Sequence, residues 1–491
     1  MTRSKDYIAV DLGAESGRLT LGKFDGKKIA LEEKHRFATG GTRLNNTLYW
    51  DAINFFNEIK IGLQKCNKSE IAAIAFDSWG VDFGLIDKNN HLLENPVHYR
   101  DSRNDGMMEE CFKKVSREEV FEKTGAQFMQ INTLFQLLWM RINQPYLLQS
   151  SDCLLPMAAL FSYFFSGEKA AEFTLATTTQ CYDPRKNRWS SEILERLDIP
   201  CKIMPQIVNP GTVIGKLLPS ISEELVITRI PVIATASHDT AAAVVAVPAE
   251  GNNWAFLSSG TWSLMGCEIS NPLINQEVLK NNFTNEGGVN NTFRFLKNIM
   301  GLWLVQECRR NWESHGTKLP YSALTKEAEK AKAFFCFIDP EDTFFLKPGN
   351  MPEKIQNYCR KTNQKVPLDR GSILRCVMES LAFKYRQVIE KLEEMRQRKI
   401  DVLHIVGGGI QNKLLCQLTA NATKKHIIAG PIEATATGNI LIQAIATGEL
   451  SSVKQAREIV RNSFELIRYE PEQTDMWEET YERYKNHKLK N

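Results

Sequence analysis

Residues 7–24 read YIAVDLGAESGRLTLGKF and place a turn of small residues between two apolar stretches. The first stretch, Tyr7–Gly13, is typical of a short strand, and an extended pattern resumes over Arg18–Phe24. Ile29–Phe37 then alternates apolar and charged residues. We therefore expect three strands in quick succession, joined by glycine-containing turns and paired as a meander.

A helix and a fourth strand are expected to follow this meander. The segment Leu48–Leu63 carries apolar residues mostly three apart, which predicts a helix with one apolar face: Trp50, Ile53, Phe56, Ile59, Ile61 and Leu63. Ile71–Phe76 is an uninterrupted apolar run, typical of a buried parallel strand. The predicted order is β-β-β-α-β.

The same order restarts at Trp254. Trp254–Ser258 and Trp262–Cys267 are strand-like and flank a small-residue turn, and Phe293–Ile299 is a third strand before a helix. A long helix is expected near Ser372–Arg396, from its apolar residues at spacings of three and four. The two halves share the order of their predicted elements but not their residue identities. An ancient duplication and a chance similarity would both explain this repeat.

The stretch Ala246–Asn253 reads AVPAEGNN, which has the Pro, Gly and Asn content of a linker or hinge. We place a domain boundary there and predict an α/β protein with domains at 1–248 and 249–491. The tail Ser463–Asn491 is polar with interspersed aromatic residues, which indicates a peripheral helix.

Length and charge limit the possible functions. A chain of 491 residues is long enough for two to four domains. Lys plus Arg number 61 against 58 Asp plus Glu, a net charge of +3, which is too small to attract nucleic acid or an anionic membrane. The most apolar stretches, near Leu154–Phe165 and Ala241–Val247, are shorter than the ~18 residues of a membrane-spanning helix.

Eleven cysteines, an odd number without CxxC pairs, argue against a disulfide framework and against a zinc knuckle. The N-terminal residues pass directly into a strand-like segment and lack the apolar core of a secretory signal. We therefore expect a cytoplasmic protein.

The turn Asp11–Arg18 is the first motif that could carry chemistry. Small residues between two strands let backbone N–H groups approach a phosphate closely. Asp11 could hold a metal ion through water, because Mg²⁺ needs only one or two carboxylates and keeps most of its waters. An ordinary hairpin turn is the alternative. The segment matches neither a Walker loop nor a dinucleotide-binding fingerprint.

Two further small-residue turns lie in the second half of the chain. Leu257–Ser263 reads LSSGTWS and occupies the position that corresponds to the first motif. Ile405–Gly409 reads IVGGG and precedes a helix expected from about Lys413; three glycines remove the side chains that would keep a flat base from the backbone. A tight strand-to-helix turn explains the glycines equally well.

The fourth motif is Ala236–Thr240, which reads ASHDT and follows a strand at Pro231–Thr235. Asp239 stands at the start of a predicted helix, where a carboxylate is favoured by the helix dipole. Helix capping is therefore one interpretation, and a general base that accepts a hydroxyl proton during phosphoryl transfer is the other. A metal-dependent phosphohydrolase of the HD type is disfavoured, because that fold is all helical and needs more metal-binding histidines than this chain, with eight His, offers.

These four motifs, with DSWGVDF, YRDSR, KNIMGLWLVQ and GPIEATATGN, resemble the FGGY carbohydrate kinases of the actin-like and hexokinase-like ATPase superfamily. The match runs from about Ile8 to Ala444 in the family's order. The resemblance implies two ribonuclease-H-like domains that flank a catalytic cleft holding ATP and a sugar. Within the family, the motifs are most similar to those of members that phosphorylate the ketose L-rhamnulose.

The resemblance also implies a role for individual residues. Asp239 would be the catalytic base and Asp11 would bind Mg²⁺ through water. The phosphates of ATP would face Ala14, Glu15, Ser16, Gly17, Arg18 and Thr261. The adenosine pocket would include Gly408 and Gly409, with Gln306 nearby. The sugar would contact Gly80, His238, Asp239, Thr240 and Asn298.

Two residues of the first turn leave questions open. The carboxylate of Glu15 would be unfavourable beside a triphosphate, so we expect its side chain to point away and only its N–H to face the site. Arg18 could pair with a phosphate or with a surface acid.

The activity implied by the resemblance is transfer of the γ-phosphoryl group of ATP to the 1-hydroxyl of L-rhamnulose, in L-rhamnose degradation. Closure of the domains about Ala246–Asn253 would exclude water. One alternative is a kinase of the same family for another ketose or polyol, such as L-fuculose, D-xylulose or glycerol. A second, from a different class, is a non-catalytic actin-like nucleotide switch that binds a protein partner.

Overall fold

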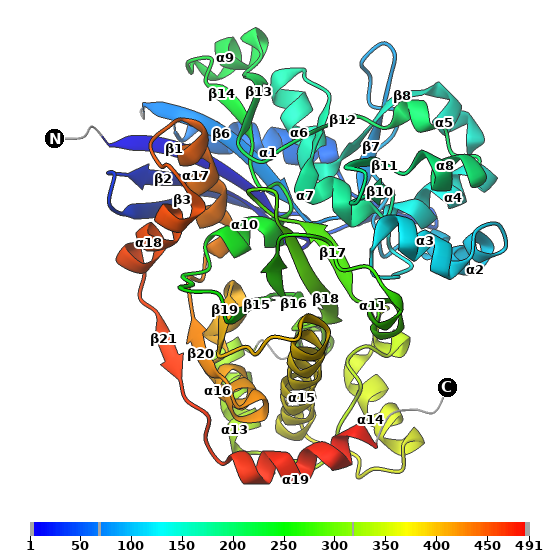
Figure 1. The fold of residues 1–491 in the computed structure, drawn as a ribbon, viewed down its shortest axis with the longest axis vertical. Helices are drawn as coiled ribbons and strands as arrows, with labels where there is room; N and C mark the ends of the chain where they lie inside the picture. The colour runs from blue at the N-terminus through cyan, green and yellow to red at the C-terminus, as the bar shows by residue number, and fades with distance from the viewer. Residues whose placement is uncertain (1–3, 67–69, 317–318, 487–491) are drawn as a thin grey trace. The chain divides into compact units, whose positions relative to one another are not determined.

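The computed structural model describes residues 4–66, 70–316 and 319–486, and its elements are labelled in Figure 1. The chain divides into two compact units. The first unit comprises Met1–Pro248, Glu268–Leu296 and Ala434–Phe464, and the second comprises Ala249–Cys267, Lys297–Glu433 and Glu465–Asn491.

A six-stranded sheet forms the centre of the first unit. Its order is β13-β14-β6-β1-β2-β3, with bounds Thr212–Lys216, Pro231–Ala234, Ile71–Ser78, Lys5–Leu12, Ser16–Phe24 and Ile29–Ala38. Strands β1, β2 and β3 pair antiparallel, whereas β1, β6 and β14 pair parallel. The meander and the buried parallel strand predicted from the apolar pattern are confirmed.

Helix α1 spans Ala52–Gln64 and begins later than predicted, because the Asp51 side chain accepts a hydrogen bond from Asn54 N and caps the helix. Residues Thr47–Tyr49 instead form strand β5, paired with β4 at Thr42–Leu44. The predicted apolar face was also wrong in part: Ile53 and Ile61 are 61% and 43% exposed. The buried stripe consists of Ala52, Phe55, Ile59, Gly62 and Leu63, at helical spacing.

The other elements of the first unit cover this sheet and extend from it. Its remaining strands are β7 (Phe83–Asp87), β8 (Ser151–Pro156), β9 (Ala170–Glu172), β10 (Tyr182–Asp183), β11 (Arg188–Trp189), β12 (Gln206–Val208) and β17 (Thr284–Gly287). Its remaining α-helices are α2 (Met107–Phe112), α3 (Arg117–Thr124), α4 (Thr133–Asn143), α5 (Pro145–Ser150), α6 (Met157–Ser166), α7 (Phe173–Ala176), α8 (Ser191–Arg196), α9 (Pro219–Leu225), α10 (Asp239–Val245), α11 (Gln276–Asn281), α17 (Ala434–Ala446) and α18 (Val453–Ser463). Its short 3-10 helices are η1 (Ser102–Asn104), η2 (Thr177–Thr179) and η3 (Cys201–Ile203).

Helices α10 and α17 lie in close contact (Figure 1). A Cβ atom added at Gly438 of α17 would lie 1.8 Å from the backbone oxygen of Ala242 in α10, so only glycine permits this approach. Helix α17 also contacts β1, because Gln443 Nε2 donates to the carbonyl of Ile8 at 2.9 Å. The position of α10 is therefore fixed through a helix that lies some 200 residues further along the chain.

The second sheet has seven strands in the order β17-β18-β16-β15-β19-β20-β21. Strands β18, β16, β15, β19, β20 and β21 span Phe293–Met300, Trp262–Ile269, Trp254–Ser259, Val402–Val406, His426–Ala429 and Ile467–Tyr469. The antiparallel pair of β15 and β16, with β19 parallel to β15, repeats the arrangement of β1, β2 and β6. The predicted restart of the pattern at Trp254 is confirmed.

The helices of the second unit include the predicted long helix, α15, at Arg370–Arg396. The others are α12 (Trp303–Ser314), α13 (Tyr321–Lys330), η4 (Thr343–Phe345), α14 (Met351–Lys361), η5 (Gly408–Gln411), α16 (Lys413–Thr423) and α19 (Thr474–Lys485).

The C-terminal tail is more than a peripheral helix. Strand β21 adds to the second sheet next to β20. Trp477, Tyr481 and Tyr484 of α19 are buried, and their rings pack against Phe383 of α15. The interspersed aromatic residues of the tail are thus part of a core and not surface residues.

Within the described ranges, no helix combines the length and the apolar character needed to cross a membrane. All eleven cysteines are free thiols.

Candidate active site

Two carboxylates lie side by side where parallel strands β1 and β6 end. Asp11 and Asp77 are directly opposite in the register of these strands, and both are buried. Asp77 Oδ2 accepts a hydrogen bond of 2.6 Å from Asn439 Nδ2 of α17. Asp77 was missed from the sequence, although its position directly after the apolar run Ile71–Phe76 is the signal of a polar residue at the end of a buried strand.

A third carboxylate, Asp239, is the first residue of α10. Its side chain is 32% exposed, and its Oδ1 accepts a hydrogen bond of 2.5 Å from Thr240 N. Burial raises the pKa of Asp239, and the charge of Asp11 adds to the rise. Burial likewise raises the pKa of Asp77 well above its usual range, again with a contribution from Asp11. Asp11, Asp77 and Asp239 therefore form one electrostatically coupled group.

Arg18 supplies the positive charge beside this group. It faces Asp11 across the β1–β2 pair, and its Nη2 lies 2.9 Å from Asp11 Oδ2. The Asp11 side chain is only 4% exposed. Arg18 thus pairs with an acid, as one of the two alternatives has it, and that acid is the buried Asp11.

The turn between β1 and β2 is a hydrogen-bonded loop. Gly13 N donates to Ser16 O at 3.1 Å, and Thr39 donates to Gly13 O through its hydroxyl and to Glu15 O through its N–H. Glu15 is exposed. Ala14 lies in the same turn, and Ser16 and Gly17 open β2, where a Cβ at Gly17 would fall 2.3 Å from the Phe37 ring. The Phe37 ring thus occupies the space that Gly17 leaves free.

Hydrogen bonds to the end of β9 and the start of α7 hold the segment before Asp239. Ser237 N donates to Glu172 Oε2 at 3.0 Å, and His238 N donates to Thr174 Oγ1 at 3.0 Å. Thr174 Oγ1 in turn donates to Glu172 Oε2 at 2.5 Å. Burial raises the pKa of Glu172 to about 7. This buried network fixes the backbone from which His238 and Asp239 project.

A buried ion pair orients the His238 ring. Arg294 and Glu286 face each other across β17 and β18 and lie 3.1 Å apart. His238 Nδ1 is 3.1 Å from Arg294 Nη2 and 3.3 Å from Glu286 Oε2, and Nε2 is 3.4 Å from Asp239 Oδ1. Neither partner was predicted from the sequence; the available signal was Arg294, a charged residue between Phe293 and Phe295 in strand β18.

Asp82, just after Gly80, is the centre of another buried network. Its oxygens accept hydrogen bonds from Trp50 Nε1 at 2.6 Å, Trp79 Nε1 at 3.0 Å and Gln136 Nε2 at 2.9 Å. Burial raises the pKa of Asp82 to about 6. At Gly80 itself, a Cβ atom would lie 2.8 Å from the Thr178 hydroxyl, which places this glycine in a tight contact. The hydrogen bonds thus hold a row of aromatic rings beside Gly80.

In the second unit, Thr261 occupies the turn between β15 and β16. Its carbonyl accepts hydrogen bonds from Gly301 N at 3.2 Å and Trp303 N at 3.1 Å, which tie the turn to the start of α12. Gln306 follows in α12, and its Oε1 is buried without a hydrogen-bond partner among the described residues. Asn298 lies in β18.

The three glycines after β19 have different roles. Gly407 has a φ of +89°, and a Cβ at Gly409 would lie 2.0 Å from Ser259 Oγ of β15. A Cβ at Gly408 would have no atom within 4 Å. The Ser259 side chain therefore occupies the space beside Gly409, whereas the space beside Gly408 is open.

Family models match both halves of the chain. The N-terminal domain of the FGGY family of carbohydrate kinases matches residues 7–246, and the C-terminal domain of the same family matches residues 255–447. The chain belongs to the FGGY family of carbohydrate kinases and is an ATP-dependent sugar kinase.

Curated relatives give the group within the family. A rhamnulokinase from Bacteroides thetaiotaomicron is 43% identical over 98% of this chain and 99% of its own length. The rhamnulokinases of Halalkalibacterium halodurans and Bacillus subtilis are 42% and 37% identical, over 94% and 96% of this chain and 98% and 96% of theirs. Within the family, this chain belongs with the rhamnulokinases.

Solved structures have the same fold. A xylulose kinase from Lactobacillus acidophilus aligns with a TM-score of 0.82 at 16% identity, over 98% of this chain and 97% of its own. A glycerol kinase from Plasmodium falciparum aligns with a TM-score of 0.77 at 14% identity, with the same coverage. The predicted α/β fold of two-domain sugar kinases is confirmed.

Proposed function

We propose that this chain transfers the γ-phosphoryl group of ATP to the 1-hydroxyl of L-rhamnulose, giving L-rhamnulose 1-phosphate and ADP, as a step of L-rhamnose degradation. Its similarity to rhamnulokinases over nearly its whole length supports the substrate. The observation that carries the chemistry is Asp239, a carboxylate with raised pKa that projects from a backbone segment fixed by Glu172 and Thr174.

Asp239 is the base in this proposal. Its carboxylate accepts the proton of the 1-hydroxyl while that oxygen bonds to the γ-phosphorus and the bond from the γ-phosphorus to the bridging oxygen of ADP breaks. Because the transition state of phosphoryl transfer is loose, the proton moves late, and positioning and charge neutralisation provide most of the rate. A raised pKa makes Asp239 a better proton acceptor than an ordinary aspartate.

The proposed sugar contacts are Gly80, His238, Thr240 and Asn298, together with Asp239. The Glu286–Arg294 pair orients the ring of His238 from the side away from Asp239. Arg294 Nη2 can only donate and forms the hydrogen bond with Nδ1 at 3.1 Å, which favours the tautomer in which Nδ1 accepts and Nε2 carries the proton; Glu286 Oε2, at 3.3 Å from Nδ1, favours the opposite tautomer. His238 would then offer an N–H to an oxygen.

The proposed contacts with ATP lie in the β1–β2 turn with the start of β2, the β15–β16 turn, the turn after β19, and helix α12. Ala14, Glu15, Ser16, Gly17 and Arg18 would face the phosphates with their N–H groups and the Arg18 guanidinium, and Thr261 would do so with its hydroxyl. Gly408 and Gln306 would bind the adenosine, with Gly409 as part of the same turn. Two observations support these assignments: the open space at Gly408, and Gln306 Oε1, which can accept from an amino group and has no hydrogen-bond partner in the described part of the chain.

The carboxylates of the first unit fit a magnesium ion. Asp11 and Asp77 lie opposite each other, and Asp77 Oδ1 is buried without a hydrogen bond from the described residues, as expected of an oxygen that serves a cation. Asp11 would hold Mg²⁺ through water, with Asp77 and Asp239 nearby. Bound there, Mg²⁺ would neutralise charge on the β- and γ-phosphates.

We also propose a domain boundary between residues 248 and 249. This boundary rests on the Pro, Gly and Asn content of Ala246–Asn253.

We further propose a cytoplasmic location. This location rests on the odd number of cysteines, eleven, which suits a reducing compartment in which ATP is also present.

The experiment is ADP release by the purified chain with ATP, Mg²⁺ and one of four acceptors: L-rhamnulose, L-fuculose, D-xylulose or glycerol. We expect the highest kcat/KM with L-rhamnulose, and phosphorus NMR of the product should show a phosphate ester on C1. A higher kcat/KM with another acceptor would overturn the substrate but not the class of enzyme. Slow ATP hydrolysis that no acceptor changes would indicate the nucleotide switch instead.

A further inference from the structure

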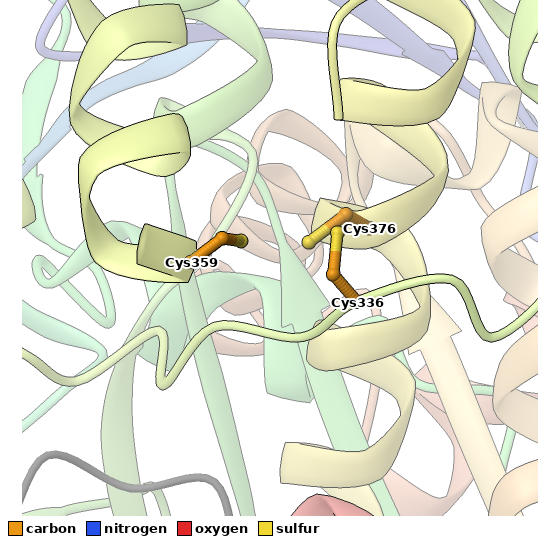
Figure 2. Close-up of side chains that lie close together, drawn as sticks. All are labelled: Cys336, Cys359 and Cys376. Atoms are coloured by element: carbon orange, nitrogen blue, oxygen red, sulfur yellow. The ribbon is translucent and has the colours of Figure 1, made fainter. Parts of the chain in front are cut away.

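Three cysteines from separate segments of the second unit meet in its interior. Cys336 lies in the chain after α13, Cys359 in α14 and Cys376 in α15, and Figure 2 shows their side chains directed toward one another. Their Sγ atoms all lie within 4.8 Å of one another. Each residue is at most 2% exposed. None of the three belongs to a motif assigned to the kinase reaction.

We propose that Cys336, Cys359 and Cys376 form a binding site for one thiophilic divalent cation of the Zn²⁺ class. Three sulfur atoms at these separations can surround a single ion after small adjustments, since Zn–S bonds are about 2.3 Å long. Sulfur ligands select soft or borderline cations over Mg²⁺. The proposal is independent of the proposed kinase reaction.

The backbone around Cys336 is held in place, as a preformed site requires. Phe337 exchanges two hydrogen bonds of 2.8 Å with the Gln364 side chain, and Gln364 N donates to the carbonyl of Cys359 at 2.9 Å. On the other side, Ser380 Oγ accepts from Ile338 N at 3.0 Å and donates to the carbonyl of Cys376 at 2.6 Å. One bridging side chain thus connects the Cys336 segment to each of the other two cysteines.

Charge favours a divalent over a monovalent ion. Three thiolates with a divalent cation carry one net negative charge, whereas a monovalent cation would leave two in a buried position. Phe335 and Phe337, on either side of Cys336, line a cavity of about 280 Å³ that is also lined by Lys332, Lys365 and Arg483. Solvent in this cavity therefore reaches the two neighbours of Cys336, while Cys336 itself is 1% exposed.

Without metal, the protonated forms of Cys336 and Cys376 are favoured, because hydrogen bonds within the cluster and burial raise the pKa of both thiols. The hydrogen bond with Cys359 raises the pKa of Cys336, and burial adds to the rise. The cation must therefore displace protons when it binds. Thiols that are buried only as small apolar groups would also be protonated. A metal-binding measurement is therefore needed to distinguish a metal site from an ordinary cluster of packed cysteines.

The test uses the full chain, reduced and desalted under argon, then incubated with Zn²⁺ or, as a spectroscopic probe, Cd²⁺. We expect one ion per chain to survive gel filtration, an ultraviolet band from sulfur-to-cadmium charge transfer, and a higher Tm. Cys336→Ser and Cys376→Ser should each lose the retained ion. Cys66→Ser, a buried cysteine outside the cluster, is the matched control and should retain it.

If a variant fails to fold, the wild-type chain alone still tests the proposal. Wild-type protein that is folded and fully reduced but retains neither Zn²⁺ nor Cd²⁺ would overturn it. A disulfide between two of the three cysteines, found by mass spectrometry in protein purified without oxygen, would also do so. The ion would lie outside the cluster if Cys66→Ser lost the retained metal. The same would follow if Cys336→Ser and Cys376→Ser both kept it.

Discussion

Arg18 Nη2 lies 2.9 Å from Asp11 Oδ2, and Asp11 stands directly opposite Asp77 on the neighbouring strand. One cation thus faces two adjacent carboxylates in an interior where burial penalises each charge. The Arg18 guanidinium therefore neutralises part of the negative charge, and a Mg²⁺ ion bound near Asp11 would neutralise more of it.

Arg18→Gln should therefore destabilise the chain, because it leaves Asp11 without its ionic partner. We expect a loss of about 3 kcal/mol in the free energy of unfolding, the lower end for breaking a buried pair, since the Arg18 side chain is 23% exposed. Urea unfolding with and without saturating Mg²⁺ provides the measurement, and Mg²⁺ should recover part of the loss. Arg36→Gln removes an exposed pair with Glu33 and should cost at most about 1 kcal/mol. An Arg18 variant as stable as the Arg36 control would contradict this account.

Asp239→Asn removes the proposed base without changing its size. We expect both sugar and ATP to bind with nearly unchanged Kd in calorimetry, while kcat falls by roughly 10²–10⁴, the usual contribution of general acid–base catalysis. Because the pKa of Asp239 is raised and only its ionised form accepts a proton, wild-type kcat should fall on the acidic side at a higher pH than an ordinary aspartate would give. Asp198→Asn, an exposed aspartate, is the control. Turnover of Asp239→Asn near the wild-type rate would remove Asp239 from this role.

Thr261→Val tests the turn of the second unit. The carbonyl of Thr261, and not its hydroxyl, ties the turn to α12, so valine should preserve the fold. We expect a higher KM for ATP or a lower kcat, with an unchanged Kd for sugar measured in the absence of nucleotide. Thr325→Val, on the exposed part of α13, should change neither. If the ATP response of Thr261→Val is that of the wild type, the hydroxyl does not contact a phosphate.

The strands were predictable because each buried strand carries its own apolar pattern, as in Ile71–Phe76. The partners of the functional groups were not, because they come from distant parts of the chain. Asp77 meets Asn439 across 362 positions of sequence, and no local pattern records that contact. The error in α1 has a related cause: Ile53 and Phe55 are both apolar, and only the packing of α1 on β3 decides that Phe55 is buried.

Glu172 gives the stability of the chain a definite pH dependence. The folded state keeps the proton of Glu172 up to about pH 7, whereas an ordinary glutamate releases it near 4.5. The folded state therefore binds more protons between these values, so the free energy of unfolding falls as pH rises from about 4.5 to about 7, by up to about 3 kcal/mol. Asp82, with a pKa of about 6, acts in the same direction.

Glu172→Gln should flatten this slope, although it also weakens the network at Ser237 because glutamine has one acceptor oxygen. Urea unfolding at a series of pH values measures the slope, which is independent of the overall loss in stability. Glu118→Gln, at an exposed position of α3, should leave the slope as it is in the wild type. A slope that Glu172→Gln does not change would assign the titration to other groups.

Gly438→Ala tests whether the contact of α17 with α10 positions the base. The added Cβ would lie 1.8 Å from the backbone oxygen of Ala242, an atom that cannot rotate away, so the two helices must separate. We expect the free energy of unfolding to fall by about 1–3 kcal/mol, as for overpacked cores, and kcat to fall at least tenfold at temperatures where the variant is folded. Gly40→Ala is the control, because a Cβ there has no atom within 4 Å. A variant that loses stability but keeps the wild-type kcat would show that α10 can shift without moving Asp239 from its working position.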